Sequence, residues 1–561
     1  MLCTCIDKYT TGIGIKVLFH HIENIDTFWF LSLPASDSVP AYRSSLIGCF
    51  ISVLQSTIRT NCFRPNPGHH MNRFLPLLIA AIALASPSVG HAAKKAEVRS
   101  EGPLAGVLGP ILNDPSLRGT EYGVQVVNVN TGEEVFARNA DVSLVPASVM
   151  KVLTAAVALR ELGAGYRFST YASSSSKISD DGVLEGDLYV QGFGDPTLVT
   201  EDLWRLVYDL WLAGIRRVEG DIIFDATHFD GERLIRGWRK DVDMANGPAY
   251  FAPLGALSVN FNTVCIVIGP GSEAGGQGDV ILETPQDSVR VINQVTTGAR
   301  RSRPRYNIER TVRGRQRVQL RVSGSVPLGA RPTRFYRSVA DPLAQFQAVF
   351  KTHMDERGID IAGEFKEGEA PDGLSMIARH ESTSLPMILA RMNKHSSNFV
   401  AEHVLKAVGA EASNDDEGST TNGLAVVADY LESLGADRGE FKLVNGSGLS
   451  RDALLRPSHV NSVLIDMAQD RMIGPEFMAS LAIGGVDGTL WTRFRGEGVE
   501  GRVRGKTGSM NHVNALAAYV DGGDGELYAF TFFVNDIPGS NRAVRRLHTR
   551  FGRAILDLSA P

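Results

Sequence analysis

Three short groups of residues in this sequence could together form a nucleophilic centre. Ser148 precedes Lys151 by three positions, Ser396 precedes Asn398 by two, and Lys506 begins a Lys-Thr-Gly triplet. A serine hydroxyl is a weak nucleophile until a neighbouring base removes its proton, and a lysine whose pKa is lowered by burial can be that base. The three groups, in this order, predict a serine acyl-transfer site with a lysine base.

The first group stands at the start of a predicted helix. Ser148 and Lys151 lie at the start of the run 149–162, whose apolar residues recur with a helical period. Pro146 before this run and Gly163 after it are typical of the start and the end of a helix. Side chains three positions apart project from the same helix face, so the amine can reach the hydroxyl. A Ser-x-x-Lys pair alone is more often a capping serine with a surface lysine, so its meaning depends on the other two groups.

The second group follows a predicted helix over 386–395. Ser396 can relay a proton between the base and a leaving amine. Asn398 offers both a donor and an acceptor, which suits a substrate amide and suits holding Lys151 in place. We therefore predict that Ser396 and Asn398 are catalytic.

The third group lies on a predicted strand near the C-terminus. Lys506 and Thr507 can grip a carboxylate, and Gly508 lets another chain segment approach the strand closely. The backbone N–H of Ser509 is expected to form an oxyanion hole together with that of Ser148.

Two histidines near these groups offer a different base. His395 and His512 flank the second and third groups and could indicate a Ser–His arrangement. No Gly-x-Ser-x-Gly pattern surrounds Ser148, so lysine is the preferred base.

The elements that must position these groups come from both ends of the chain. Alternating residues over 123–129 and 134–137, around an Asn-Thr-Gly turn, predict a β-hairpin. Near the other end the sequence predicts three strands and a basic amphipathic helix, over 502–508, 513–520, 526–534 and 541–558. We expect the hairpin and these strands to share one antiparallel sheet with helices on its faces, so the long middle is an insertion into a split domain.

The insertion has its own pattern. Two strands and a helix between them are predicted over 184–190, 220–225 and 200–213, and the stretch 259–326 is β-rich. Eight arginines lie between Arg300 and Arg317, where Tyr306 is the only aromatic residue. Single-strand nucleic-acid binding needs interleaved aromatic residues, so we expect a solvated strand face or contact with anionic cell-wall polymer.

Composition agrees with a globular protein that does not bind nucleic acid. The 561 residues exceed one ordinary domain, and 43% hydrophobic with 21% charged residues is a globular balance. A formal net charge of −5 provides no global basic field, so nucleic acid is not an expected partner.

Residues 71–92 have the order of features of a secretory signal. Arg73 supplies the positive charge, 74–85 supply the apolar segment, and Gly90-His91-Ala92 supplies the cleavage site. The apolar segment is too short for a comfortable membrane span, although a buried hydrophobic element is an alternative. We predict that Met71 is the true start and that 1–70 are an over-extended gene model.

The cysteines agree with this prediction. Four of the five, Cys3, Cys5, Cys49 and Cys62, lie upstream, which leaves Cys265 alone in the exported protein. One cysteine forms no internal disulfide, and its apolar neighbours predict a buried small hydrophobe rather than a nucleophile.

Together the motifs resemble the penicillin-binding D-alanyl-D-alanine carboxypeptidases/endopeptidases of the low-molecular-mass, insertion-bearing class C type. The resemblance extends over the longer segments 146–156, 392–402, 446–451 and 506–510. Ser396 lies 248 positions after Ser148, a gap that also fits this subgroup. The similarity covers roughly residues 100–561.

The resemblance implies a mixed α/β (α+β) fold. A split β-lactamase/transpeptidase-like catalytic domain, an antiparallel sheet flanked by helices, is expected over 93–170 and 375–561. Residues 171–374 are expected to form an insertion of two smaller domains, whose β-rich part spans about 255–330.

The resemblance also implies a periplasmic serine hydrolase without cofactor or metal. Ser148 would attack the D-Ala-D-Ala carbonyl of peptidoglycan peptides, releasing D-Ala or opening a D-Ala–diaminopimelate crosslink through an acyl-enzyme. β-Lactam antibiotics would acylate Ser148 as covalent inhibitors, and the enzyme would associate peripherally with the membrane or the cell wall.

Further residues are implied to bind substrate. Arg451 matches the family's arginine after Gly-Ser-Gly-Leu-Ser, and Asp243 and Tyr250 match acidic and aromatic positions in the insertion. Thr507 and Gly508, already named, and Met510 complete the expected binding set.

Two other functions use the same scaffold. A serine β-lactamase of class C would have tyrosine in place of Ser396, and one of class A would need a water-activating glutamate on a loop, for which the sequence offers no candidate. A catalytically silent cell-wall binding protein would be free to lose Ser148, Lys151 or Lys506, and all three are present.

Overall fold

The computed structural model describes residues 102–237, 247–284, 288–313, 317–412 and 417–558. The predicted signal segment 71–92, the predicted upstream extension 1–70 and Asp243 lie outside the described residues. Among the helices that the structure describes, none combines the length and apolar character needed to cross a bilayer.

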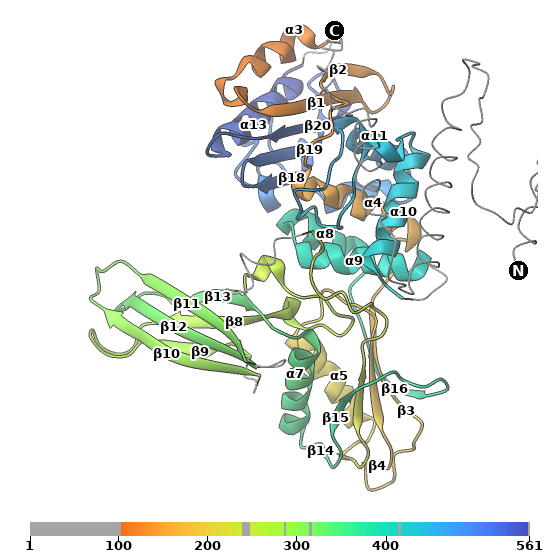
Figure 1. The fold of residues 1–561 in the computed structure, drawn as a ribbon, viewed down its shortest axis with the longest axis vertical. Coiled ribbons are helices and arrows are strands. Elements are labelled where there is room, and N and C mark those ends of the chain that lie inside the picture. Colours follow the sequence, from red (N-terminus) through yellow and green to blue (C-terminus); the bar gives the residue numbers. More distant parts are fainter. Residues whose placement is uncertain (1–101, 238–246, 285–287, 314–316, 413–416, 559–561) are drawn as a thin grey trace, which may run out of the picture. The chain divides into compact units, whose positions relative to one another are not determined.

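A six-stranded antiparallel sheet combines both ends of the chain. Its order is β17-β18-β19-β20-β1-β2. The strands are β17 (Ala482–Ile483), β18 (Val503–Met510), β19 (Val513–Asp521), β20 (Leu527–Asn535), β1 (Glu121–Asn128) and β2 (Glu134–Arg138). β1 pairs with β20 so that Val124 faces Phe532, and Figure 1 shows the two side by side. The prediction of one shared sheet is confirmed.

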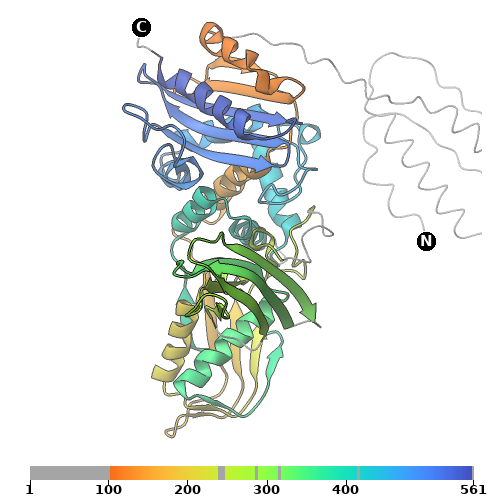
Figure 2. The same cartoon turned by 90° about the vertical axis from the view of Figure 1, so that its left-hand side faces the viewer.

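Each face of this sheet has its own hydrophobic core, because side chains alternate along a strand. Along β19, Leu516 and Val520 pack with α13 (Arg542–Leu556), and Figure 2 shows this C-terminal helix lying over one face of the sheet. Ala517 and Tyr519 pack in the core of the opposite face. The helices on that side are α4 (Met150–Glu161), α8 (Leu385–His395), α9 (Asn398–Ala412), α10 (Thr420–Ser433), α11 (Pro457–Gln469) and α12 (Gly474–Ser480).

One part of the insertion is an α/β unit, built from chain segments that come before and after the β-rich part. It contains a five-stranded sheet of order β15-β7-β5-β3-β16 and a three-stranded sheet of order β14-β6-β4. The strands are β3 (Ser169–Ser174), β4 (Val183–Leu184), β5 (Leu188–Gly192), β6 (Arg217–Val218), β7 (Ile222–Asp225), β14 (Asp360–Ile361), β15 (Phe365–Glu367) and β16 (Ser375–Glu381). Helices α5 (Thr200–Leu212) and α7 (Pro342–Arg357) supply apolar side chains to the same core. The domain borders given above stay a prediction.

The prediction of one strand over 184–190 is wrong. β4 ends at Leu184 and pairs with β6, whereas β5 begins at Leu188 and pairs with β3 and β7. Gly186 lies in the break, where an added Cβ would meet the Ser176 Oγ at 2.2 Å. Because Ser176 packs closely against the backbone at Gly186, the chain forms two separate strands here, where the alternating sequence had predicted one.

The second part of the insertion is β-rich, as predicted. Two three-stranded sheets enclose a core that includes Ile266 and Leu320. The strands are β8 (Thr263–Gly269), β9 (Asp279–Leu282), β10 (Val289–Gly298), β11 (Arg305–Arg313), β12 (Arg317–Pro327) and β13 (Thr333–Ser338). In the arginine run, Arg301 and Arg303 are exposed, while Arg310 donates to the Val339 carbonyl at 2.9 Å.

Candidate active site

Ser148 lies in a tight turn that two glycines accommodate. The 3-10 turn η3 (Ala147–Val149) leads directly into α4, so Ser148 sits just before the α-helix and not within it. Ala147 has a φ of 46°, a left-handed conformation that is uncommon for a residue with a side chain. A Cβ on Gly448 would lie 1.9 Å from the Ala147 oxygen, and one on Gly508 would lie 2.6 Å from the Pro146 oxygen. The absence of side chains at both glycines therefore permits the serine turn to sit where it does.

The amine of Lys151 lies at the centre of the site. Its side chain is fully buried, and its Nζ donates to Ser148 Oγ at 2.9 Å, Asn398 Oδ1 at 2.8 Å and the Ser447 carbonyl at 2.7 Å. Burial lowers the pKa of Lys151 to about 7, because the charged ammonium loses its hydration. An amine with this pKa is available as a base near neutral pH.

Glu402 is a functional candidate that the sequence reasoning did not identify. Its carboxylate is 1% exposed and accepts from the backbone N–H groups of Gly446 at 3.0 Å and Ser447 at 2.9 Å. Burial raises the pKa of Glu402, whereas the hydrogen bonds from Ser447 and Gly446 and the charge of Lys151 lower it. An acidic residue one helical turn after Asn398, inside the apolar part of α9, was the available signal.

A second buried lysine holds the second serine. Ser396 caps α8 in a left-handed conformation, with a φ of 58°. The Lys506 Nζ donates to Ser396 Oγ at 2.8 Å and to the Thr507 carbonyl at 2.8 Å. Lys506 is fully buried, so desolvation, followed by repulsion from Lys151, holds its pKa well below the usual range. The structure thus brings Ser148, Lys151, Ser396 and Lys506 into one connected site.

The end of β18 completes the predicted set. Thr507 donates to the Thr489 hydroxyl at 2.8 Å, and the exposed Ser509 accepts from Asn541 Nδ2 at 3.1 Å. The Arg451 guanidinium donates to the Asn511 carbonyl at 2.7 Å, which places this arginine beside the strand end.

Two more predicted binding residues border the site. Met510 is the last residue of β18 and is half-buried. Tyr250 lies in η4 (Ala249–Phe251) and is 49% exposed, and its backbone carbonyl accepts from Asn398 Nδ2 at 3.0 Å. Tyr250 thus contacts Asn398 through its main chain.

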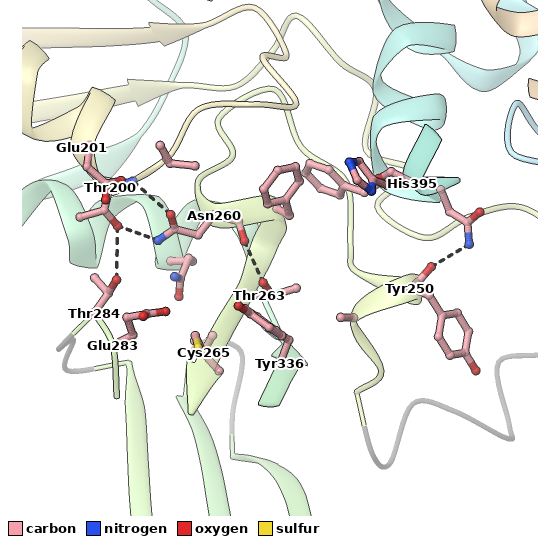
Figure 3. A pocket seen from close by; sticks show the side chains of 18 of the residues that line it. Thr200, Glu201, Tyr250, Asn260, Thr263, Cys265, Glu283, Thr284, Tyr336 and His395 are labelled. Carbon is pink, nitrogen blue, oxygen red and sulfur yellow. Dashed lines mark hydrogen bonds between the residues drawn. The ribbon is translucent and has the colours of Figure 1, made fainter. Parts of the chain in front are cut away.

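A pocket of about 580 Å³ adjoins Ser396 and Asn398 on the side of the insertion. Figure 3 shows side chains from several insertion elements around it, including Thr200, Cys265 and Tyr336. Cys265 is half-buried and lines this pocket, so the prediction that it is a buried small hydrophobe is wrong about its burial. Desolvation, then the Glu283 carboxylate, raises the pKa of the Cys265 thiol to about 11, so the thiol stays protonated.

On the other side of Ser148 a groove of about 1210 Å³ runs past Thr507 and Ser509 to α13. Ser148, Ser396, Thr507 and Ser509 all line it, so the serine turn faces open space on this side.

The geometry favours lysine over histidine as the base. His512 places its Nδ1 at 2.7 Å from the Ile537 carbonyl, and the hydrogen-bond partner of the Ser148 hydroxyl is Lys151. Among the residues that the structure describes, no group of three or more His, Cys, Asp or Glu side chains is placed to hold a metal ion.

Sequence comparisons agree with this geometry. The model of the D-Ala-D-Ala carboxypeptidase 3 (S13) family matches residues 104–550. A D-alanyl-D-alanine carboxypeptidase of Actinomadura sp. is 35% identical over 481 residues, which are 83% of this chain and 86% of the relative. The D-alanyl-D-alanine carboxypeptidase DacB of Haemophilus influenzae is 28% identical over 74% of this chain and 86% of its own length.

The fold is also that of solved relatives. The crystal structure of penicillin binding protein 4 (dacB) from Haemophilus influenzae aligns with a TM-score of 0.69 at 25% identity, covering 80% of this chain and 99% of that one. The same protein complexed with a novel β-lactam aligns with a TM-score of 0.64 at 26% identity, over 80% of this chain and 97% of the other. The expected split transpeptidase-like fold with inserted domains is confirmed, and the chain belongs to the D-Ala-D-Ala carboxypeptidase 3 (S13) family, as a serine-type hydrolase of that class.

Proposed function

We propose that Ser148 is the nucleophile of a D-Ala-D-Ala carboxypeptidase and that Lys151 is its base. The observation that supports this most directly is the 2.9 Å contact between the Lys151 Nζ and the Ser148 Oγ, with the pKa of Lys151 lowered to about 7. A neutral amine at this distance can accept the hydroxyl proton as the oxygen attacks.

Acylation begins as the Ser148 proton passes to Lys151 and the Ser148 oxygen bonds to the carbonyl carbon of the penultimate D-Ala. The carbonyl oxygen then carries a negative charge, which the backbone N–H groups of Ser148 and Ser509 stabilise. The carbon–nitrogen bond breaks, and the leaving amine takes a proton from the hydroxyl of Ser396. Ser396 recovers its proton from the base, so the site returns to its starting protonation.

Deacylation repeats these steps with water. A water molecule gives its proton to the base, its oxygen bonds to the acyl carbon, and the Ser148 oxygen leaves with a proton. The products are the shortened peptide and the regenerated enzyme. Asn398 holds Lys151 in position throughout, and the buried Glu402 fixes the loop whose Ser447 carbonyl accepts from the same amine.

The substrates proposed are peptidoglycan stem peptides and their crosslinks. Thr507, Gly508 and Met510 border the place where the C-terminal carboxylate would lie, beside the buried amine of Lys506. Arg451, Tyr250 and Asp243 would hold the side chain of the third residue of the stem. Penicillins would acylate Ser148 as well, since a relative of the same fold is described in complex with a β-lactam.

The site of action is proposed to be the periplasm. Residues 71–92 would act as the signal peptide, and 1–70 would be absent from the native protein. The exported enzyme would associate peripherally with the membrane or the cell wall. Mass spectrometry of the exported protein tests the start site, because a mature N-terminus upstream of Met71 would overturn it.

Release of D-Ala from a pentapeptide monomer tests the function, with Ser148→Ala as the matched variant. We expect D-Ala release from the wild-type enzyme and none from the variant. A labelled penicillin distinguishes the alternatives: a stable adduct supports the peptidase, rapid turnover of the drug would support a β-lactamase, and no adduct would support a silent binding protein.

A further inference from the structure

The groove beyond Ser509 has a marked excess of positive charge. Seven arginines line it, from the segment after η7 (Gly488–Leu490) and from α13: Arg493, Arg495, Arg542, Arg545, Arg546, Arg550 and Arg553. No Asp or Glu occurs among its described lining residues. The whole chain is acidic by formal charge, so this excess is local.

Most arginines of the groove form no ion pair with the residues that the structure describes. Within the described part of the chain, Arg550 alone among the seven forms an ion pair, at 2.8 Å with Asp114. The Arg493 Nε donates to the Thr549 hydroxyl at 3.0 Å, whereas its Nη2 is buried without a hydrogen-bond partner there. Burial, followed by repulsion from Arg545, lowers the pKa of Arg493 to about 10. A buried donor without a partner is destabilising, the more so when it is charged, and a bound carboxylate would supply the missing acceptor.

The groove begins at the reacting serine. Ser148, Thr507 and Ser509 line its inner end, and the Arg545 Nη2 donates to the Ser509 Oγ at 3.2 Å. The pocket beside Tyr250 lies on the insertion side of Ser396, where the acyl part of the substrate is proposed to lie. The arginines therefore occupy the side toward which the amine leaves.

The size of the groove excludes a single amino acid as its full occupant. Pockets for drug-sized ligands measure about 300–1,000 Å³, and this groove has about 1210 Å³. A released D-Ala would fill only its inner end and would leave most of the arginines without a counter-ion.

We propose that this groove binds the acidic peptide that leaves when a crosslink is cut, with Arg493 and Arg545 receiving its carboxylates. This inference rests on the proposed function, in which Ser148 opens D-Ala–diaminopimelate crosslinks. The diaminopimelate carbon that supplies the amine also carries a carboxylate, and a stem glutamate adds another. Guanidinium groups bind carboxylates in bidentate pairs, which suits a row of arginines beside the scissile bond.

The wall of the groove also includes an aromatic side chain. Trp491 is 56% exposed, and the Arg495 guanidinium lies 5.1 Å from the centre of its ring. The Trp491 ring can pack against apolar parts of a bound peptide, while the Arg495 guanidinium binds a carboxylate of the same peptide.

Two purified substrates separate this inference from its alternatives: a crosslinked muropeptide dimer and a pentapeptide monomer. For Arg493→Gln we expect kcat/KM on the dimer to fall tenfold or more, and the ratio of dimer to monomer cleavage to fall with it. The surface variant R542Q/R546Q, which disturbs no buried group, should lower the same ratio at least threefold. Added salt should raise KM for the dimer more than for the monomer, because screening weakens exposed charge pairs.

The matched control is R331Q/R471Q, which removes two exposed arginines that do not line the groove and should leave the ratio unchanged. Retained labelling of each variant by penicillin establishes that its serine site is folded. Equal losses on both substrates, an unchanged ratio in both groove variants, or a wild-type enzyme that cleaves the monomer and not the dimer would overturn the inference. If Ser148→Ala retained cleavage of both substrates, the proposed function itself would fail.

Discussion

Replacing Gly448 by alanine tests whether the close packing around the serine turn is needed for acylation. Gly448 has a φ of 73°, and an added Cβ would lie 1.9 Å from the Ala147 oxygen, where ordinary contacts start at 3.4 Å. The backbone of the turn or of the loop 446–448 must therefore move by about 1.5 Å to admit a methyl group. Because Ser148 directly follows Ala147, this displacement reaches the nucleophile.

Two separate costs can be assigned to this substitution. The left-handed conformation costs a residue with a side chain about 1–2 kcal/mol, and this part lowers stability alone. A misplacement of about 1 Å at a reacting group can lower a rate by about 100-fold. We therefore expect the acylation rate of Gly448→Ala to fall by about 100-fold or more.

Gly119→Ala is the matched control. Gly119 has a φ of 71°, nearly equal to that of Gly448, but nothing lies within 4 Å of its added Cβ. The control should lose a similar amount of stability from backbone conformation and keep its acylation rate. Stopped-flow labelling with a fluorescent penicillin measures the rate, and urea unfolding measures the stability. Equal acylation rates in the two variants would refute the reasoning.

Three further predictions concern charge and proton transfer. Since the pKa of Lys151 is about 7 and its neutral amine is the base, kcat/KM should rise with pH through that value. Glu402→Gln removes the charge that raises the pKa of Lys151, so this rise should move to lower pH. A pH profile that does not move would count against Lys151 as the base. Ser396→Ala should slow acylation by about 10²–10⁴-fold, the usual contribution of a positioned proton donor, and a wild-type rate of penicillin labelling would exclude the relay. Burial holds the pKa of His548 well below its ordinary 6.5, so the unfolded chain binds more protons below pH 6.5 and the free energy of unfolding should drop by up to about 1.4 kcal/mol per pH unit. His548→Phe should flatten this dependence in urea unfolding at pH 7 and pH 5, and an identical slope in both proteins would contradict it.

Local patterns predicted the parts of the fold that repeat regularly. Alternation over 123–129 predicted β1, and the strands predicted over 513–520 and 526–534, on either side of a glycine-rich turn, predicted β19 and β20. The structure joins all three in one sheet. The strand break at Gly186 was missed, since alternation continues through it and only a neighbouring segment, at Ser176, makes the glycine necessary.

In the candidate site, the sequence indicated residue types and could not indicate partners. Lys506 was expected to bind a carboxylate, and the sequence did not indicate that its amine donates to Ser396 and to the Thr507 carbonyl. Glu402 went unrecognised because its role depends on a loop more than forty positions away, which only the tertiary fold brings to it. Long-range contacts of this kind carry no local signature.

The most direct test of the central claim is the location of the acyl group. After reaction with penicillin, proteolysis and mass spectrometry should place the adduct on the peptide that contains Ser148, and Ser148→Ala should carry none. An adduct on a peptide without Ser148, or an equal adduct on the alanine variant, would contradict the account.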